Sequence, residues 1–207
     1  MSIKKQAMSI FGYPIWISEE TYNFNDKELD YIKSLPTKMN GGGGGNRISL
    51  DDYLFKNTEM SNIKNFCQKQ IDKYFYELMN VEDQIKIYPT QAWANYNKKS
   101  ESHHSHFHAN SIVSGVLYVQ TDGVKIHFER DKYSELWPMQ LRYKDFDYYN
   151  AFSWWAKSEP GKIILFPSKL AHRVEENEGE TERISIAINT FVKGYLGDDL
   201  DKTGLRL

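Results

Sequence analysis

The sequence predicts an α+β protein in which helices near the N-terminus precede a single β core. Two segments before Met79 carry apolar residues at helical spacing, whereas the chain beyond Ile85 consists of short β-rich runs separated by Gly, Asn, Asp and Pro. Short strands at this spacing are typical of a sandwich or a small barrel. The 207 residues, 40% of them hydrophobic, can bury one substantial core. We therefore expect a single domain over 1–207, helical over about 1–84, with its β core over about 85–195.

The N-terminal elements follow from local signals. The apolar run 10–17 predicts a strand, and Pro14 favours an edge position for it. Asn25 can cap a helix that Pro36 ends. The five consecutive glycines at 41–45 predict a mobile surface loop; no strand precedes them and no Lys-Ser/Thr pair follows, which disfavours phosphate binding.

The segment 61–79 has the spacing of a helix that packs on a sheet. Cys67, the only cysteine, falls on its apolar face and is expected to be a small buried hydrophobe. The β-rich runs that should form the core are 85–88, 91–96, 112–120, 124–128, 162–166 and 184–192.

Composition narrows the possible partners and compartments. The formal net charge is −2, from 26 basic and 28 acidic residues, which argues against capture of nucleic acid or of an anionic membrane. The chain starts without the apolar core of a signal peptide and has no run of about 20 apolar residues. With one cysteine it cannot form an internal disulfide. We expect a cytoplasmic protein with no membrane or nucleic-acid partner.

Histidines are concentrated at one place in the sequence. Four of the six lie within 103–108, just before the β-like run 112–119, and His172 follows the apolar run 163–167. Imidazole is the commonest side-chain ligand of borderline transition metals, so a metal site is the first hypothesis. The alternative for His106 and His108 is a polar strand edge. His103 and His104 are expected in a loop, either solvated or behind the ligands.

A second group of polar residues lies on the last predicted strand. Arg183 and Ser185 alternate with Ile184, Ile186 and Ile188, so one face is aliphatic and the other carries a guanidinium and a hydroxyl. An inward Arg with a hydroxyl neighbour is a good carboxylate receptor. A structural salt bridge of Arg183 is the alternative.

Taken together, these segments resemble the Fe(II)- and 2-oxoglutarate-dependent oxygenase superfamily, and within it a narrower oxygenase family seen in phage and bacterial genomes. The resemblance rests on the order and spacing of five fragments, which are Trp93-Ala94-Asn95-Tyr96-Asn97, His106-Phe107-His108-Ala109-Asn110-Ser111, Ser114-Gly115-Val116-Leu117-Tyr118-Val119, Phe166-Pro167-Ser168 ahead of His172, and Arg183-Ile184-Ser185-Ile186-Ala187-Ile188-Asn189. Arg183 follows His172 by 11 positions, close to the usual separation of the distal ligand and the co-substrate arginine.

The resemblance implies a double-stranded β-helix core (jelly-roll, cupin-like) with the N-terminal helices packed on it. It implies Fe(II) held by His106, His108 and His172, and 2-oxoglutarate held by Arg183 and Ser185, with Tyr118 as a further hydroxyl donor. The superfamily usually has Asp or Glu where His108 stands. A His at this position is a feature of the narrower family. The alternative is that His108 lies beside the metal without binding it.

Three functions remain open at this level. The first is an Fe(II)/2-oxoglutarate-dependent hydroxylase that uses O₂ and an unidentified substrate and releases succinate and CO₂. The second is a three-histidine, cupin-like metal enzyme that does not use 2-oxoglutarate. The third is a non-catalytic, phage-type β module with a degenerate metal site. The aromatic segment 133–155 is interpreted as part of the substrate entrance, with ordinary packing as the alternative.

Overall fold

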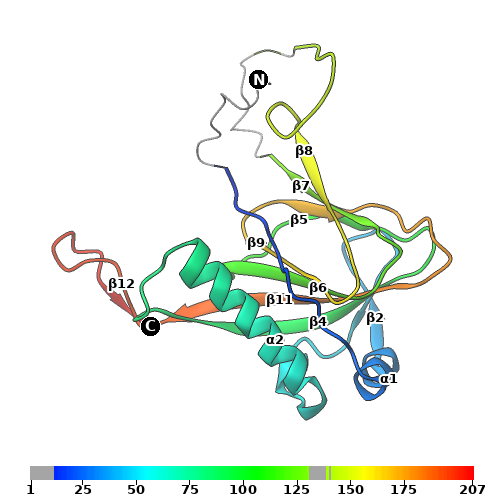
Figure 1. The fold of residues 1–207 in the computed structure, drawn as a ribbon, viewed down its shortest axis with the longest axis horizontal. Helices are drawn as coiled ribbons and strands as arrows, with labels where there is room; N and C mark the ends of the chain where they lie inside the picture. Colours follow the sequence, from blue (N-terminus) through cyan, green and yellow to red (C-terminus); the bar gives the residue numbers. More distant parts are fainter. Residues whose placement is uncertain (1–11, 131–138, 140) are drawn as a thin grey trace.

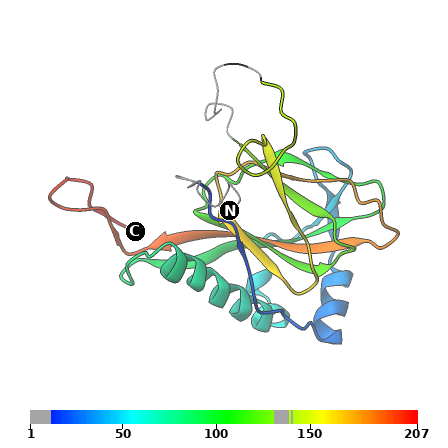
Figure 2. The ribbon, with the colours of Figure 1, turned by 45° about the horizontal axis from the view of Figure 1, so that its top comes forward.

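The computed structural model describes residues 12–130, 139 and 141–207, which are mostly β-sheet with few helices. The larger sheet has seven strands in the order β1-β9-β6-β11-β4-β3-β2, and the smaller has four in the order β5-β10-β7-β8. In both views the smaller sheet lies on one side of the larger one and helix α2 on the other (Figures 1 and 2). All pairings within these two sheets are antiparallel.

The strands of the larger sheet are β1 (Trp16–Ile17), β2 (Thr37–Met39), β3 (Arg47–Ser49), β4 (Lys86–Asn97), β6 (Val113–Gln120), β9 (Ile163–Pro167) and β11 (Arg183–Lys193). Those of the smaller sheet are β5 (His103–His106), β7 (Lys125–Glu129), β8 (Ser153–Lys157) and β10 (His172–Val174). A separate hairpin joins β12 (Tyr195–Leu196) to β13 (Leu205–Arg206). The expected opening strand 10–17 lies partly outside the described residues; within them it is reduced to β1.

The helices begin and end close to the predicted positions. Asn25 caps α1 (Asp26–Ser34): its side chain accepts from the backbone N–H of Glu28 at 3.0 Å, and the Glu28 carboxylate accepts from the backbone N–H of Asn25. Two short 3₁₀ turns, η2 (Leu54–Lys56) and η3 (Thr58–Met60), lead into α2 (Ser61–Asp72). A π-helical stretch, η4 (Lys73–Leu78), continues α2.

Two hydrophobic clusters lie on opposite faces of the larger sheet. One cluster contains the buried face of α2, with Ile63, Cys67 and Ile71, together with the isoleucines of β11. Burial raises the pKa of the Cys67 thiol, as expected for a cysteine that serves as a core residue. The other cluster lies toward the smaller sheet and includes Val116, Tyr118 and Phe166. The polar face of β11 therefore points toward the smaller sheet, away from α2.

The structure corrects three expectations from the sequence. The part over about 1–84, expected to be helical, also contributes β1, β2 and β3 to the larger sheet. The runs 85–88 and 91–96 form one strand, β4, because a bulge in its pairing with β11, between Asn189 and Thr190, accommodates Pro89. His103 and His104 lie in strand β5 and not in a loop.

The glycine run 41–45 is exposed, but its end is joined to the start of β5. Gly45 forms an isolated bridge with Ser102, whose backbone N–H donates to the Gly44 carbonyl at 2.8 Å. Among the described helices, none is long and apolar enough to cross a bilayer.

Candidate metal centre

Three of the histidines named from the sequence converge between the two sheets. His106 ends β5 and lies opposite His172 on β10, while His108 follows two residues after His106. One ring nitrogen from each of the three lies within 4.8 Å of the other two. The backbone of His108 is held in place because its N–H donates to the Ser168 carbonyl, just beyond β9, at 3.0 Å.

The Nδ1 atom of each of the three rings has an oxygen partner. His106 Nδ1 lies 2.9 Å from the His104 carbonyl, and His172 Nδ1 lies 3.0 Å from the Leu170 carbonyl. A carbonyl oxygen only accepts, so both Nδ1 atoms carry the proton. His108 Nδ1 lies 2.6 Å from the side-chain oxygen of Asn189 and 2.8 Å from Ser114 Oγ; the closer partner, an amide oxygen, only accepts, which gives the same tautomer. In all three rings Nε2 is therefore left as an unprotonated lone pair.

Two of these lone pairs face each other. His106 Nε2 and His108 Nε2 are 3.2 Å apart, and neither has a proton to share. Two nitrogens bound to one ion at about 2.1 Å, with an angle between 90° and 109°, would be about 3.0–3.4 Å apart. A bound cation would replace the lone-pair repulsion with two coordinate bonds, so the donor set fits a transition-metal ion.

Burial keeps these rings neutral. Together with the smaller effect of the neighbouring His106, it lowers the pKa of His172 to about 3 and that of His108 to about 4. The pKa of His106 is also lowered by burial. Neutral imidazole is the form that binds a metal, so no proton competes for these sites at neutral pH.

Arg183 lines the same cavity as the three histidines. Its side chain is buried, and only one of its nitrogens has a partner: Nη2 donates to Ser185 Oγ at 3.2 Å, while Nε and Nη1 have none among the described residues. Ser185 pairs with Asn95 on β4 and with Tyr118 on β6, so adjacent strands bring these three residues to one face. Burial lowers the pKa of Arg183 and raises that of Tyr118 to about 12.

The cavity between the histidines and Arg183 is small, about 20 Å³, which is room for about one water. None of its described lining residues is a carboxylate. They are Trp93, Asn95, His103, His106, His108, Val116, Tyr118, Ile126, His172, Val174, Arg183, Ser185 and Ala187.

The remaining candidates lie around this cavity or away from it. His103 lines it, and the amide of Asn40 lies 3.1 Å from His103 Nε2. Sequence reasoning placed His103 in a loop, because a four-residue polar strand gives no hydrophobic alternation. His127 pairs with Glu175 at 3.0 Å across the smaller sheet, as a partly buried strand residue.

Only part of the aromatic segment 133–155 can be placed. Trp154 and Trp155 are partly exposed on β8 and do not line the cavity. Residues 133–138, including Trp137, and residue 140 lie outside the described residues. A role for this segment at the substrate entrance stays a prediction.

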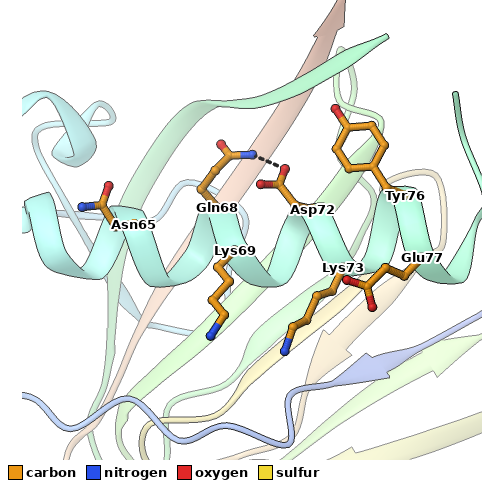
Figure 3. Close-up of a pocket in the computed structure, with 7 residues that line it drawn as sticks. All are labelled: Asn65, Gln68, Lys69, Asp72, Lys73, Tyr76 and Glu77. Carbon is orange, nitrogen blue, oxygen red and sulfur yellow. Dashed lines mark hydrogen bonds between the residues drawn. The ribbon is translucent and has the colours of Figure 1, made fainter. Parts of the chain in front are cut away.

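A larger hollow of about 420 Å³ lies along the outer face of α2 and η4 (Figure 3). Its side chains are largely paired with neighbours. Lys69 and Lys73 both bind Glu20 at 2.9 Å, and Gln68 donates to Asp72 at 2.7 Å. These pairs satisfy the charges of an exposed helix face, so we assign no chemistry to it.

Residues 91–189 match the family described as putative 2OG-Fe(II) oxygenase, a stretch that contains the three histidines and Arg183. This match confirms the resemblance found in the sequence, and the description names the two cofactors that were expected, Fe(II) and 2-oxoglutarate. No curated protein matches the chain in sequence.

Solved structures share the fold at low identity. An oxidoreductase of the 2OG-Fe(II) oxygenase family from Burkholderia pseudomallei is 12% identical, with a TM-score of 0.59 over 85% of this chain and 84% of that one. HygX from Streptomyces hygroscopicus, with nickel and 2-oxoglutarate bound, is 9% identical, with a TM-score of 0.55 over 85% and 82%. A prolyl hydroxylase from Trichoplax adhaerens, in complex with a hypoxia inducible factor peptide, is 12% identical, with a TM-score of 0.56 over 86% and 83%.

The chain thus has the jelly-roll fold of these oxygenase structures. Its β core over residues 91–189 is the part assigned to the putative 2OG-Fe(II) oxygenase family.

Proposed function

We propose that the protein is an Fe(II)- and 2-oxoglutarate-dependent oxygenase that hydroxylates an unidentified substrate. His106, His108 and His172 would hold the iron through Nε2, and Arg183, Ser185 and Tyr118 would hold the co-substrate. The observation that supports this most strongly is the buried guanidinium of Arg183, with two unpartnered nitrogens, in the same cavity as three converging histidines.

The charges in the cavity favour a dianionic co-substrate. Three neutral imidazoles leave the full +2 charge of the ion in place, Arg183 adds one more, and no described lining residue is acidic. A buried charge without a partner is costly, whereas a bidentate guanidinium–carboxylate pair is among the strongest side-chain contacts. The two carboxylates of 2-oxoglutarate would balance much of this charge, one near the ion and one at Arg183.

The co-substrate needs more room than the closed cavity offers. A cavity of about 20 Å³ cannot hold a five-carbon diacid, so a wall side chain must move. We assign this movement to His103, because it is only partly buried and lies on β5, the edge strand of the smaller sheet. The metal ligands and Arg183 can then stay in place while the co-substrate enters.

When bound, Fe(II), 2-oxoglutarate and O₂ together supply the oxidant that hydroxylates a C–H bond, with release of succinate and CO₂. The contribution of this chain is positional. Asn189 and the carbonyls of His104 and Leu170 keep each Nε2 unprotonated, and the apolar walls formed by Val116, Ile126 and Val174 limit access of water.

The test is succinate formation by tag-free protein supplied with Fe(II), 2-oxoglutarate and O₂. We expect turnover of 2-oxoglutarate that depends on iron and is lost in His172→Ala and in Arg183→Met. Arg47→Lys, a change to a partly buried arginine on β3, serves as the matched control and should retain turnover. If Arg183→Met consumes 2-oxoglutarate as fast as wild type does, the co-substrate site is wrong.

One observation favours the second candidate, a three-histidine metal enzyme that works without a 2-oxo acid: the ligand set contains no carboxylate. That enzyme would bind the metal normally but show no 2-oxoglutarate-dependent change in the visible spectrum of the bound ion. A titration of metal-loaded protein with 2-oxoglutarate, followed by visible absorption, therefore separates the two functions.

A further inference from the structure

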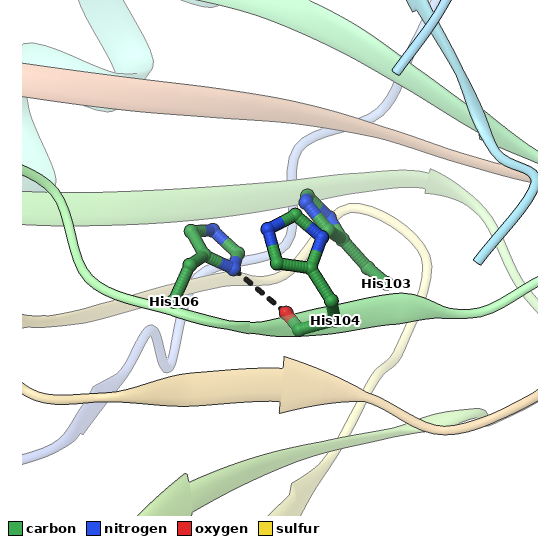
Figure 4. Close-up of side chains that lie close together, drawn as sticks. All are labelled: His103, His104 and His106. Atoms are coloured by element: carbon green, nitrogen blue, oxygen red, sulfur yellow. Dashed lines mark hydrogen bonds between the residues drawn. The ribbon is translucent and has the colours of Figure 1, made fainter. Parts of the chain in front are cut away.

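Strand β5 carries one residue more than the strand it pairs with. His106 lies opposite His172 and His103 lies opposite Val174, so three steps along β5 match two steps along β10. Such a bulge breaks the alternation of side chains and turns neighbouring residues toward the same side. Figure 4 shows the result: His103, His104 and His106 rise from one side of β5.

These three histidines form a second group with the geometry of the first. One ring nitrogen of each lies within 4.8 Å of the other two. Their ring centroids are 4.4, 5.0 and 5.1 Å apart, against 4.3, 5.1 and 5.1 Å for His106, His108 and His172. The two groups share His106 and differ in their other two members.

The ring of His104 has a nitrogen inside the fold that is available to bind a metal ion. Its Nδ1 is buried and has no hydrogen-bond partner among the described residues. Buried polar atoms are nearly always paired, so an unpaired ring nitrogen beside two other imidazoles points to a missing ligand. Gly42 packs directly against this ring, and a Cβ at that position would overlap it, so the glycine run leaves the space that His104 occupies.

His103 is also placed for such a role. The amide of Asn40 lies 3.1 Å from its Nε2, and its ring stacks on that of His106 at an interplanar angle of 20°. An amide offers both a donor and an acceptor, so Asn40 can support either tautomer of His103 and leave Nδ1 as a ligand.

We propose that His103, His104 and His106 form a second binding position for a borderline divalent cation such as Co²⁺, Ni²⁺ or Zn²⁺, which neutral imidazoles suit. The two positions exclude each other as three-histidine sites. His106 has only Nε2 to offer, because its Nδ1 donates to the His104 carbonyl. An ion at the second position therefore occupies His106, which can then no longer bind an ion at the first position. The second position lies beside the cavity that His103 lines.

The test uses residues that belong to one group only. Tag-free apoprotein is titrated with Co²⁺, followed by visible absorption and calorimetry, in wild type, His104→Ala, His172→Ala and the double variant His104→Ala/His172→Ala. We expect His104→Ala to bind its first Co²⁺ as wild type does, through the first position. We expect His172→Ala to bind one Co²⁺ at least about 10-fold more tightly than the double variant, because only the former retains three ligands.

Equal Co²⁺ affinity of His172→Ala and the double variant would overturn the proposal. Far-UV circular dichroism checks that each variant is folded. If His172→Ala does not fold, His108→Ala and His104→Ala/His108→Ala provide the same comparison, since His108 is absent from the second group. None of these measurements involves 2-oxoglutarate, so they stand apart from the test of the proposed reaction.

Discussion

Replacing Arg183 with Met should leave the apoprotein at least as stable as wild type and abolish tight 2-oxoglutarate binding. In the apoprotein, the guanidinium is buried, and two of its three nitrogens have no partner. Methionine has a similar length and needs no hydrogen bonds. Replacing buried charged groups with apolar ones of similar volume is often neutral or stabilising by about 1–4 kcal/mol, so we expect the free energy of unfolding to stay the same or rise within that range.

Co-substrate binding should change much more. Removing one partner of a buried, hydrogen-bonded charge pair costs about 2–5 kcal/mol, which corresponds to a loss of affinity between about 30-fold and several thousand-fold. The affinity for the metal alone should not fall, because Arg183 makes no hydrogen bond to the three histidines in the described structure and its positive charge repels the ion.

Two assays measure the two effects. Urea unfolding of the metal-free protein gives the free energy, and calorimetry with Mn²⁺-loaded protein under nitrogen gives the dissociation constant for 2-oxoglutarate. A variant that is clearly less stable than wild type, yet binds 2-oxoglutarate equally well, would show that Arg183 is a structural residue with a partner inside the fold.

Three further predictions concern the surroundings of the site. Asn189→Leu should weaken Mn²⁺ binding about 10–100-fold, because His108 Nδ1 loses the closer of its two oxygen partners and keeps only Ser114 Oγ, while Asn189→Asp should retain Mn²⁺ binding; equal losses in calorimetric titrations of both would exclude a positioning role. His103→Ala should enlarge the cavity and lower the dissociation constant for 2-oxoglutarate in metal-loaded protein, whereas a weaker affinity would mean that His103 contacts the co-substrate. Gly44→Ala should lower the free energy of unfolding by about 1–2 kcal/mol, because Gly44 has a φ of +86° and faces the backbone of Ser102. Gly41→Ala, whose Cβ would meet open space, is the control, and equal denaturation midpoints for the two would indicate that the glycine run does not pack on β5.

The sequence predicted most where its signals were local. The helix cap at Asn25 and the alternation of Ile184, Ile186 and Ile188 with polar neighbours were read correctly, because a capping side chain and a period of two each have one structural interpretation. The grouping of His106, His108 and His172 rested on the resemblance, and the structure brings these residues together. Their role as ligands stays a prediction.

The parts that could not be predicted depend on tertiary pairing. Strand β5 is four polar residues long, and its position is set by the pairing of His106 with His172, which are far apart in sequence. The bulge that turns His103 and His104 to one side leaves no local signal. A supporting role of Asn189 behind the ligands could be proposed from the sequence, with a satisfied buried amide as the alternative, whereas its contact with His108 depends on how the two sheets face each other.

A crystal structure of the tag-free protein with Mn²⁺ and 2-oxoglutarate tests the central claim most directly. We predict one ion bound by Nε2 of His106, His108 and His172, with one carboxylate of 2-oxoglutarate near the ion and the other paired with Arg183. A structure in which 2-oxoglutarate binds away from Arg183, or in which His108 and His172 do not coordinate, would contradict it.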